Sequence, residues 1–484
     1  MFRMKKFYIT TSIPYTNAPP HIGFALEAVQ ADVLSRYHKK LGEDVFYLTG
    51  VDEHGLKIKK AAQKAGKTSQ QFVDEISAEY LKLTKALNIS NNDFIRTTDK
   101  ERHKPTVEKV WLKLKGAGDI YKKKYKGYYC SGCEAFITKK DLINGECPNH
   151  KKKPEIVEEE NYFFKLSKYL PRIKEKIESN QLKIIPQTRK NEVLGYIKQG
   201  IEDVSFSRSK EKYWGFEVPD DKNQIIYVWA DALPNYFSGI GYAQNPKKFG
   251  KYWPADVHCI GKDILKFHAL IWPAMILSLK LPLPKTIFVH GFINVAGEKM
   301  SKSLGNTVNP FKLIEKYGTD AVRYYLLREI SPTEDGDFTI EKFKVRYNSD
   351  LASGIGNLVA RVRAMAERIG FDKCNIVIEK EVEKNKKLYK KALEEFKFNE
   401  ALKAVWKLIG FCDRYIEKER PWECGDRKAK IKNQKVLGNL LFAIDEIAGL
   451  LEPFLPETSK KIRREISGKD LKKSKEKKLL FERI

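Results

Sequence analysis

Residues 7–37 read FYITTSIPYTNAPPHIGFALEAVQADVLSRY, and this stretch decides the fold prediction. Its opening, from Phe7 to Ile13, consists mostly of β-forming residues and predicts a strand. A turn rich in proline and asparagine follows from Pro14 to Pro20. Beyond the turn, apolar residues recur at the spacing of one helix face: Ala25, Leu26, Val29, Val33, Leu34 and Tyr37. The stretch therefore predicts a strand, a loop and a helix.

The same alternation of strand and helix patterns continues along the chain. A second strand is predicted at 44–49, two helices across 57–87 and a further strand at 94–98. Strand-like runs resume later, at 224–229, 257–261 and 286–290. Such alternation is typical of an α/β fold. We predict a Rossmann-like, doubly wound parallel sheet, whose ligands lie beyond the carboxyl ends of the strands.

The patterns divide the chain into four segments. Residues 1–118 are predicted to form the first half of the catalytic domain, and 207–339 its second half. Residues 119–206 break the rhythm with a Lys/Tyr-rich entry and a cysteine cluster, so we predict an insertion there. From residue 340 to the end, almost every segment has helical periodicity. This last segment, 340–484, is predicted to be an all-α helical bundle.

The charge of the chain favours a polyanionic partner. Lysine and arginine number 90 against 63 aspartates and glutamates, which gives a formal net charge of +27. Such an excess suits a nucleic acid and predicts salt-sensitive binding. A lysine-biased proteome or a heat-adapted surface rich in charge is an alternative explanation of similar weight.

The chain is predicted to be cytoplasmic and free of membrane segments. Its most apolar run, Phe267 to Leu283, is interrupted by Lys280 and two prolines. It therefore falls short of the roughly 18 uninterrupted apolar residues that a membrane helix needs. The basic N-terminus leads straight into the turn at Pro14, so we predict no signal peptide.

Two short stretches carry groups suited to a phosphate-bearing substrate. The first is His21-Ile-Gly23 at the predicted helix start, where free backbone N–H groups attract an anion and His21 adds a donor. The second is GEKMSKSLGN, from Gly297 to Asn306, a loop with two lysines and flanking glycines. Each stretch alone also fits a plain turn glycine or an ordinary basic loop, so their combination carries the prediction.

The insertion contains a pattern of metal ligands. Cys130 and Cys133 form one knuckle, and Cys147 and His150 form a second one with the same spacing. Three thiolates and one imidazole fill a tetrahedral zinc shell and leave no position for water, which is typical of a structural site. Unrelated thiols are the alternative. The pattern predicts a structural Zn²⁺ in the insertion.

The two phosphate stretches together resemble the paired signatures of class I aminoacyl-tRNA synthetases, and the likeness covers nearly the whole chain. Within that class the chain most resembles the methionyl-tRNA synthetase family. The segments 49–55, 227–236 and 261–268 carry this narrower likeness. The resemblance implies ATP with Mg²⁺, L-methionine and tRNA(Met) as substrates and partners. It also agrees with a zinc knuckle in the insertion.

The resemblance further implies roles for individual residues. Asp52 is expected to hold the α-amino group of methionine, and the other expected methionine-binding residues are Ile13, Tyr15, Trp229, Ala232, Leu233, Tyr236, Ile264 and His268. The expected ATP-binding residues are His21, Gly23, Lys299, Ser301 and Lys302. The expected catalytic groups are His21, Lys299, Lys302 and Arg208. In the helical bundle, the residues expected to read the anticodon are Asn357, Arg361 and Trp422.

The chain departs from the family pattern at Phe24, where most members have a second histidine. Loss of a phosphate donor costs on the order of 10²–10³ in rate. We expect an active enzyme, because every other expected site group is present. Another class I synthetase, a related nucleotidyltransferase and a catalytically weak tRNA-binding paralogue stay open as alternatives. We expect a monomer, because the appended RNA-binding domain that some relatives use to dimerise is not present in the sequence.

Overall fold

The computed structural model describes residues 4–130, 135–137, 142–148, 151–295, 297–299, 308–372, 378–423, 425–467 and 479–484. The chain forms two compact units. The first unit consists of Met1–Pro20, His38–Thr84 and Ser90–His290. The second consists of His21–Tyr37, Lys85–Ile89 and Gly291–Ile484.

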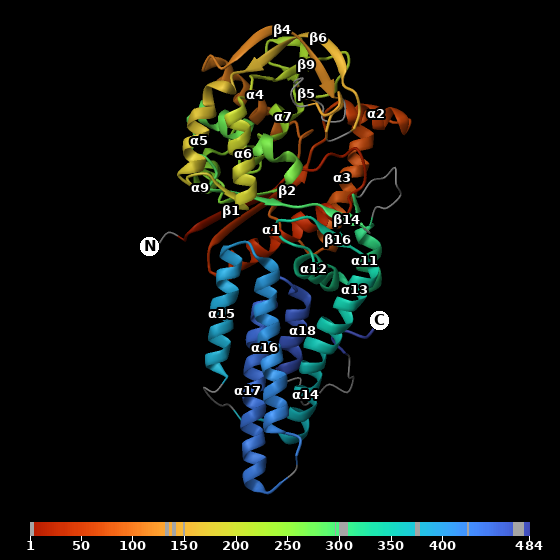
Figure 1. Ribbon diagram of the computed structural model, residues 1–484, viewed down its shortest axis with the longest axis vertical. Helices are drawn as coiled ribbons and strands as arrows, with labels where there is room; N and C mark the ends of the chain where they lie inside the picture. Colours follow the sequence, from red (N-terminus) through yellow and green to blue (C-terminus); the bar gives the residue numbers. More distant parts are fainter. Residues whose placement is uncertain are drawn as a thin grey trace. The chain divides into compact units, whose positions relative to one another are not determined.

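A six-stranded sheet lies at the centre of the first unit (Figure 1). Its strands in spatial order are β3 (Asp93–Arg96), β2 (Asp44–Val51), β1 (Lys6–Thr11), β12 (Val257–Gly261), β13 (Thr286–His290) and β7 (Lys183–Ile185). Every neighbouring pair is parallel. β1 and β2 are buried from their second residue onward, as both faces of a parallel sheet must be covered. The parallel sheet predicted from the sequence is confirmed.

Two strands differ from the prediction. The run at 224–229 does not join the central sheet, because β11 (Asp221–Ile226) pairs antiparallel with β9 (Ser207–Ser209) and β10 (Glu217–Val218). Its apolar end leads into a helix that begins at Val228. The sheet instead gains β7, a three-residue strand within 119–206 that pairs with β13. A strand this short gives too little periodicity to be recognised in the sequence.

The rest of the 119–206 segment contains a long antiparallel hairpin. β4 (Ile120–Cys130) and β6 (Glu155–Phe164) pair along ten positions, flanked by β5 (Ala135–Ile137) and β8 (Val204–Ser205). Lysines on β4 face glutamates on β6, as in Lys126 opposite Glu158 at 3.5 Å. Cross-strand pairs of opposite charge stabilise an antiparallel sheet and fix its register.

Most helices and helical turns of the first unit pack around one apolar core. The helices are α2 (Leu56–Lys64), α3 (Ser69–Ala86), α4 (His103–Gly116), α5 (Leu170–Glu178), α6 (Gln187–Gln199), α7 (Val228–Ala232), α8 (Asn235–Ser238), α9 (Pro246–Tyr252) and α10 (Trp272–Ser278). The turns are η2 (Ser167–Tyr169), η3 (Lys262–Ile264) and the π-helical η4 (Phe267–Ile271). Large side chains such as Tyr8, Trp111 and Trp272 are fully buried in this core. Each contributes about 1.5–3 kcal/mol or more through burial, which makes the core a rigid base for the loops at the strand ends.

The second unit is mainly helical. Its helices are α1 (Ile22–Lys40), α11 (Pro310–Tyr317), α12 (Thr319–Arg328), α13 (Ile340–Arg346), the π-helical η6 (Tyr347–Gly356), α14 (Asn357–Ile369), α15 (Glu379–Glu394), α16 (Phe398–Glu419), α17 (Arg427–Leu451) and α18 (Pro456–Ile466). The helices from α14 onward lie side by side as a bundle (Figure 1), which confirms the helical region predicted at the end of the chain. A small sheet joins β15 (Glu298–Lys299), β14 (Ile293–Val295) and β16 (Gly336–Phe338). Among the described residues, no helix has the length and apolar character to cross a membrane.

A buried arginine ties α1 to the bundle within the second unit. Arg323 in α12 is 0% exposed and forms an ion pair with the equally buried Asp32 of α1 at 2.8 Å. The guanidinium also donates to the backbone carbonyls of Leu87, Pro453 and Phe454 at 2.8–3.0 Å. Removing one partner of such a pair costs about 3–5 kcal/mol, because a buried charge is left behind. The contact therefore fixes α1 to the segment that precedes α18.

Candidate active site

The loop after β1 lies alongside the end of β2. Tyr15 and Asp52 form a parallel bridge, in which the Asp52 N–H donates to Pro14 O and the Thr16 N–H donates to Asp52 O, both at 2.9 Å. The Asp52 carboxylate accepts from the Thr97 hydroxyl at 3.3 Å, and the residue is only 4% exposed. The expected methionine-binding residues from the two loops are therefore neighbours at the carboxyl ends of adjacent strands.

The aromatic residues expected to enclose the methionine side chain also come together. The Tyr236 hydroxyl lies 2.8 Å from His268 Nε2, which joins α8 to η4. Trp229 stacks on Phe267 with ring centroids 3.8 Å apart and meets His268 edge-on at 6.0 Å. The remaining expected residues, Ile13, Tyr15, Ala232, Leu233 and Ile264, belong to or pack against the same core cluster or lie buried beside it. The structure thus assembles one apolar wall from three separate segments.

The hydrogen bonds of His268 determine which of its ring nitrogens carries the proton. His268 Nδ1 lies 3.0 Å from Ile264 O, and a carbonyl only accepts, so Nδ1 carries the proton. In the neutral ring Nε2 then accepts from the Tyr236 hydroxyl. The Tyr236 hydroxyl therefore donates its proton to His268 Nε2. The wall therefore presents aromatic and apolar surface, the kind of surface that suits a polarisable sulfur.

A second histidine supports Tyr236 from behind. The His258 ring lies 4.3 Å from the Tyr236 ring. Its Nε2 accepts from the Trp272 indole N–H at 3.3 Å, so Nδ1 holds the proton and donates to the Thr10 hydroxyl at 2.7 Å. Complete burial holds the pKa of His258 well below its ordinary value, and His268 lowers it further. This layer stays neutral and keeps a constant shape across the physiological pH range.

Sequence reasoning missed two polar residues that converge at the ends of β12 and β13. A Cβ atom added to Gly261 would lie 2.8 Å from Asp263 Oδ1 and 3.7 Å from the His290 ring. Both side chains therefore meet at this glycine, which lacks a side chain between them. Their positions in the sequence could have indicated a role. Gly261 and His290 end their strands, and ligands of such folds lie beyond the carboxyl ends of the strands.

The His-Ile-Gly stretch begins α1 in the second unit. The Gly23 N–H donates to His21 Nδ1 at 3.0 Å, so in the neutral ring the proton resides on Nε2. His21 is exposed at the start of this 19-residue helix, and its carbonyl accepts from the Phe24 N–H at 3.1 Å. Phe24, in contrast, is 7% exposed. The segment thus places His21 at the surface, while Phe24 contributes to the core.

Part of the lysine loop lies outside the described residues. Glu298 and Lys299 form β15, which pairs with β14 and returns the chain toward the loop. Gly297 has φ of 80° and its N–H donates to Asp337 Oδ1 at 2.8 Å, so the turn before β15 is anchored. Ser301 and Lys302 are not among the described residues, and no structural statement applies to them or to the Lys299 side chain.

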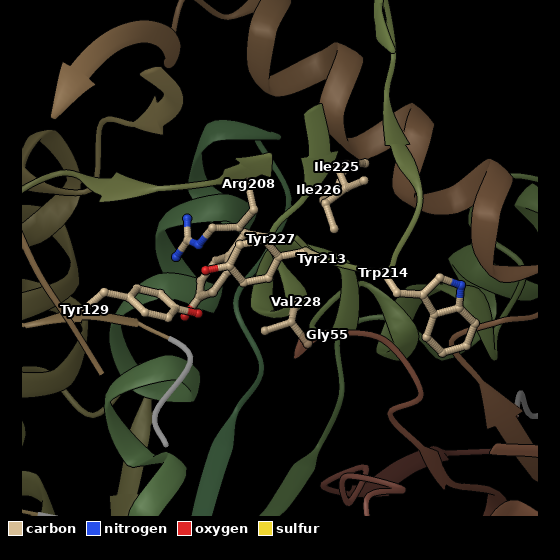
Figure 2. Close-up of a pocket in the computed structure, with 9 residues that line it drawn as sticks. All are labelled: Gly55, Tyr129, Arg208, Tyr213, Trp214, Ile225, Ile226, Tyr227 and Val228. Carbon is tan, nitrogen blue, oxygen red and sulfur yellow. The ribbon is translucent and has the colours of Figure 1, made fainter. Parts of the chain in front are cut away.

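Arg208 lines a small pocket in the first unit. Its Nη1 donates to Ser205 and Ser207 at 2.7–3.2 Å, and its guanidinium carbon lies 4.2 Å from the centre of the Tyr227 ring. Figure 2 shows Arg208 on the side of Tyr129 and Trp214 on the opposite side of this pocket. These contacts hold a 2%-exposed cation close to the segment that begins α7.

Two of the four expected metal ligands are described. Cys130 ends β4 and is 3% exposed, and Cys147 is 1% exposed. The Cys147 N–H donates to Lys152 O at 2.9 Å, and the Cys147 carbonyl accepts from the Lys151 N–H at 2.8 Å. Cys133 and His150 lie outside the described residues. The described part of the chain contains no group of three metal-binding side chains.

The residues expected to read an anticodon lie on the bundle. Asn357 is exposed at the start of α14, and Arg361 donates to Glu417 of α16 at 2.8 Å. Trp422 is half-buried in the turn between α16 and α17, where its carbonyl accepts from Arg368 at 3.3 Å. The three residues therefore belong to α14 and to the turn after α16.

Family models and known proteins match this architecture. The model described as tRNA synthetases class I (M) matches residues 7–153 and 139–363, and the anticodon-binding domain of tRNA ligase matches 376–482. The methionine--tRNA ligase of Thermotoga maritima is 43% identical over 487 residues, which cover 97% of this chain and 76% of that protein. The chain belongs to the methionyl-tRNA synthetase family. The Bacillus subtilis member is 42% identical to this synthetase over 94% of the chain and 72% of its own length.

Solved structures support the same family. Mycobacterium tuberculosis methionyl-tRNA synthetase in complex with methionyl-adenylate matches this synthetase with a TM-score of 0.91 and 36% identity, covering 95% of this chain and 93% of that one. The free form of the same enzyme matches with a TM-score of 0.84 and 32% identity, over 96% and 92% of the two chains. The synthetase family expected from the paired motifs is therefore confirmed.

Proposed function

We propose that this chain activates L-methionine with ATP and transfers it to tRNA(Met). The methionine carboxylate attacks the α-phosphorus of ATP, which gives methionyl-adenylate and releases pyrophosphate. A hydroxyl of the terminal ribose of tRNA then attacks the carbonyl carbon, and AMP leaves. The observation that carries the proposal is that Asp52 pairs with Tyr15 beyond the adjacent strands β1 and β2, and that Tyr15 packs against the same core cluster as Trp229 and Tyr236, in a chain of this family.

Residues of the first unit are proposed to hold the amino acid. Asp52 accepts from the methionine ammonium in a charge-assisted hydrogen bond. Ile13, Tyr15, Trp229, Ala232, Leu233, Tyr236, Ile264 and His268 are proposed to surround its side chain. Arg208 supports the α7 segment through Tyr227, and we propose that its charge also stabilises the reacting carboxylate and phosphate.

The phosphates are proposed to bind His21, Gly23, Lys299, Ser301 and Lys302. The His21 imidazole is proposed to donate to a phosphate, and the lysines are proposed to stabilise the negative charge that builds up on the leaving pyrophosphate. Bound Mg²⁺ supplies further charge neutralisation at the phosphate oxygens. Because no protein nucleophile takes part, catalysis rests on positioning and charge stabilisation. Asp263 and His290, at the ends of β12 and β13, are proposed to face the nucleotide.

Changing Phe24 to histidine is expected to raise or preserve the rate of ATP–pyrophosphate exchange. The new ring adds a donor near the α1 start, but it replaces a buried phenyl group and costs about 1–3 kcal/mol of stability. Exchange kinetics and the thermal unfolding midpoint of both proteins measure these two effects. No exchange in either protein would show that the chain is not an active synthetase.

We propose that Cys130, Cys133, Cys147 and His150 bind one structural Zn²⁺ in the insertion. The buried positions of Cys130 and Cys147 suit closed thiolate ligation, and two hydrogen bonds to Lys151 and Lys152 hold the Cys147 backbone. Metal analysis of the purified chain should give one zinc per molecule. A Cys147→Ser variant that keeps its full zinc content would contradict this site.

Replacing Trp422 with alanine is expected to impair charging of tRNA and to leave exchange without tRNA nearly intact. A tryptophan that stacks on an unstacked base contributes about 1–3 kcal/mol per base. Asn357 and Arg361 are proposed to address base edges from α14. The kcat/KM for tRNA should fall by at least about fivefold. An equal fall in exchange would assign Trp422 a structural role.

Three broader properties belong to the same proposal. The domain boundaries are proposed at 118/119, 206/207 and 339/340, although β7 of the central sheet lies within the second segment. The chain is proposed to act as a monomer in the cytoplasm, where tRNA is charged.

Charging of tRNA with a CAU anticodon, compared with the same tRNA carrying another anticodon, tests the function. Equal charging of both would contradict recognition of tRNA(Met) by its anticodon.

A further inference from the structure

Asp231 is a buried carboxylate within the segment 227–236, and none of the roles proposed above involves it. It lies in α7, two residues after Trp229, and is 1% exposed. Its two oxygens accept from two histidines of different elements. Asp231 Oδ2 lies 2.6 Å from His54 Nδ1, just beyond β2, and Oδ1 lies 3.1 Å from His103 Nε2, at the start of α4. One carboxylate therefore joins three segments that are far apart in the sequence.

His54 connects this carboxylate to Asp52. Its backbone N–H is 3.4 Å from Asp52 Oδ1, while its ring holds Asp231. The Thr97 hydroxyl donates to the same Asp52 oxygen at 3.3 Å. A shift of His54 would therefore move a donor that orients the Asp52 carboxylate. On the other side, His103 Nδ1 lies 2.9 Å from the Ser238 hydroxyl of α8, so both helices of the pocket wall are tied in.

The surroundings of this cluster strengthen its hydrogen bonds. The His54 ring meets Trp214 and Phe216 edge-on, with ring centroids 5.0 and 4.7 Å apart. Burial would raise the pKa of Asp231, but His54 and His103 more than offset it and hold the pKa below its ordinary value. The ionised carboxylate only accepts, so both histidines donate to it. Charge-assisted bonds of this kind are about twice as strong as neutral ones.

We propose that Asp231 is a positioning residue for the ammonium site of the amino acid. By clamping the His54 ring to α7, it sets the position of the Asp52 carboxylate relative to the aromatic wall. Methionine must reach both at once, with its ammonium at Asp52 and its thioether at the wall. This inference rests on the proposed role of Asp52, and it predicts that loss of Asp231 weakens binding of the ammonium group selectively.

Three ligands separate positioning from general folding effects. Methionine carries the ammonium, the carboxylate and the thioether, methioninol lacks the carboxylate, and 4-(methylthio)butanoate lacks the ammonium. In Asp231→Asn, the KM for methionine and the inhibition constant of methioninol should rise about ten- to hundredfold, the loss expected for one charge-assisted hydrogen bond. The inhibition constant of 4-(methylthio)butanoate and the KM for ATP should stay within about threefold. All four constants come from ATP–pyrophosphate exchange by the full chain.

Matched variants keep the experiment decisive. Asp256→Asn removes another buried carboxylate at the amino end of the strands, where it binds Lys6 at 3.0 Å and Lys285 at 2.6 Å. This variant should change the constants of all three ligands by the same small factor. His54→Asn keeps an N–H donor near the Nδ1 position, whereas His54→Leu removes it. The selective loss of ammonium binding should appear in His54→Leu, and binding should be largely restored in His54→Asn. This pair tests the inference even if Asp231→Asn fails to fold.

Three results would overturn the inference. One is an equal loss for all three ligands in Asp231→Asn, another is an unchanged KM for methionine in the folded variant, and the third is identical behaviour of the two His54 variants. Asp52→Asn serves as a separate arm. If it weakens 4-(methylthio)butanoate as much as methionine, the proposed role of Asp52 fails. If Asp52→Asn is selective for the ammonium and the Asp231 and His54 variants are not, only the present inference fails.

Discussion

Replacing Asp52 with asparagine is expected to raise the KM for methionine at least about thirtyfold and to leave the KM for ATP nearly unchanged. The carboxylate is 4% exposed and already held by Thr97, so it meets an ammonium without reorganisation. Truncating one partner of a buried, hydrogen-bonded charge pair costs about 2–5 kcal/mol. Each 1.4 kcal/mol is about a tenfold change in binding.

The chain offers a matched control on the same strand. Asp44 begins β2 at its amino end, where it is paired with Lys251, while Asp52 follows its carboxyl end. Asp44→Asn should leave both KM values within about twofold. Steady-state exchange at varied methionine and ATP measures the two variants. A similar rise in the KM for methionine in both would show that Asp52 has no special role.

Replacing Lys302 with alanine is expected to slow adenylate formation by about 10²–10³ and to change methionine binding far less. The reason is that a lysine at the leaving pyrophosphate stabilises charge that develops only in the transition state, and losing one such group costs this much. Uniform binding groups, by contrast, alter KM. Rapid-quench measurement of adenylate formation gives the rate, and equilibrium titration gives the affinity for methionine.

Lys312 provides the control for Lys302. It is an exposed lysine on α11, shortly after the loop, so its removal changes the net charge equally. Lys312→Ala should retain the wild-type rate. If Lys302→Ala lost rate and methionine affinity by the same factor, the loop would contribute to binding of the amino acid and not to the departure of pyrophosphate.

Most of the central sheet could be predicted because its strands are apolar and bounded by turn residues. β1, β2, β12 and β13 are buried nearly throughout and read as short continuous apolar runs. The helical bundle was equally clear, since its helices carry apolar residues at a regular spacing over long segments. Strands and helices with such clear patterns can be predicted from the local sequence alone.

The errors concern segments whose partners are decided by tertiary contacts. The apolar end of β11 looks like a buried strand of the main sheet, yet residues 221–226 pair with β9 and β10. β7 has three residues and gains its place only by pairing with β13. Period and composition carry no information about which strand lies beside which.

The resemblance supplied the residues proposed for the site, while the residues that support them were not predicted. Resemblance named Asp52, Tyr236 and His268, and the structure brings the latter two within 2.8 Å. The same motifs contained His54 and Asp231 without suggesting any role for either. Their bond of 2.6 Å joins positions 177 residues apart, a contact that no local pattern encodes.

The central claim is that this chain activates methionine, and ATP–pyrophosphate exchange with each of the twenty amino acids tests it most directly. Purified full-length chain is assayed at equal concentrations of each amino acid, with ATP and Mg²⁺. We predict exchange with methionine far above that with any other amino acid. Exchange that is absent for all twenty, or that is strongest with a different amino acid, would contradict the claim.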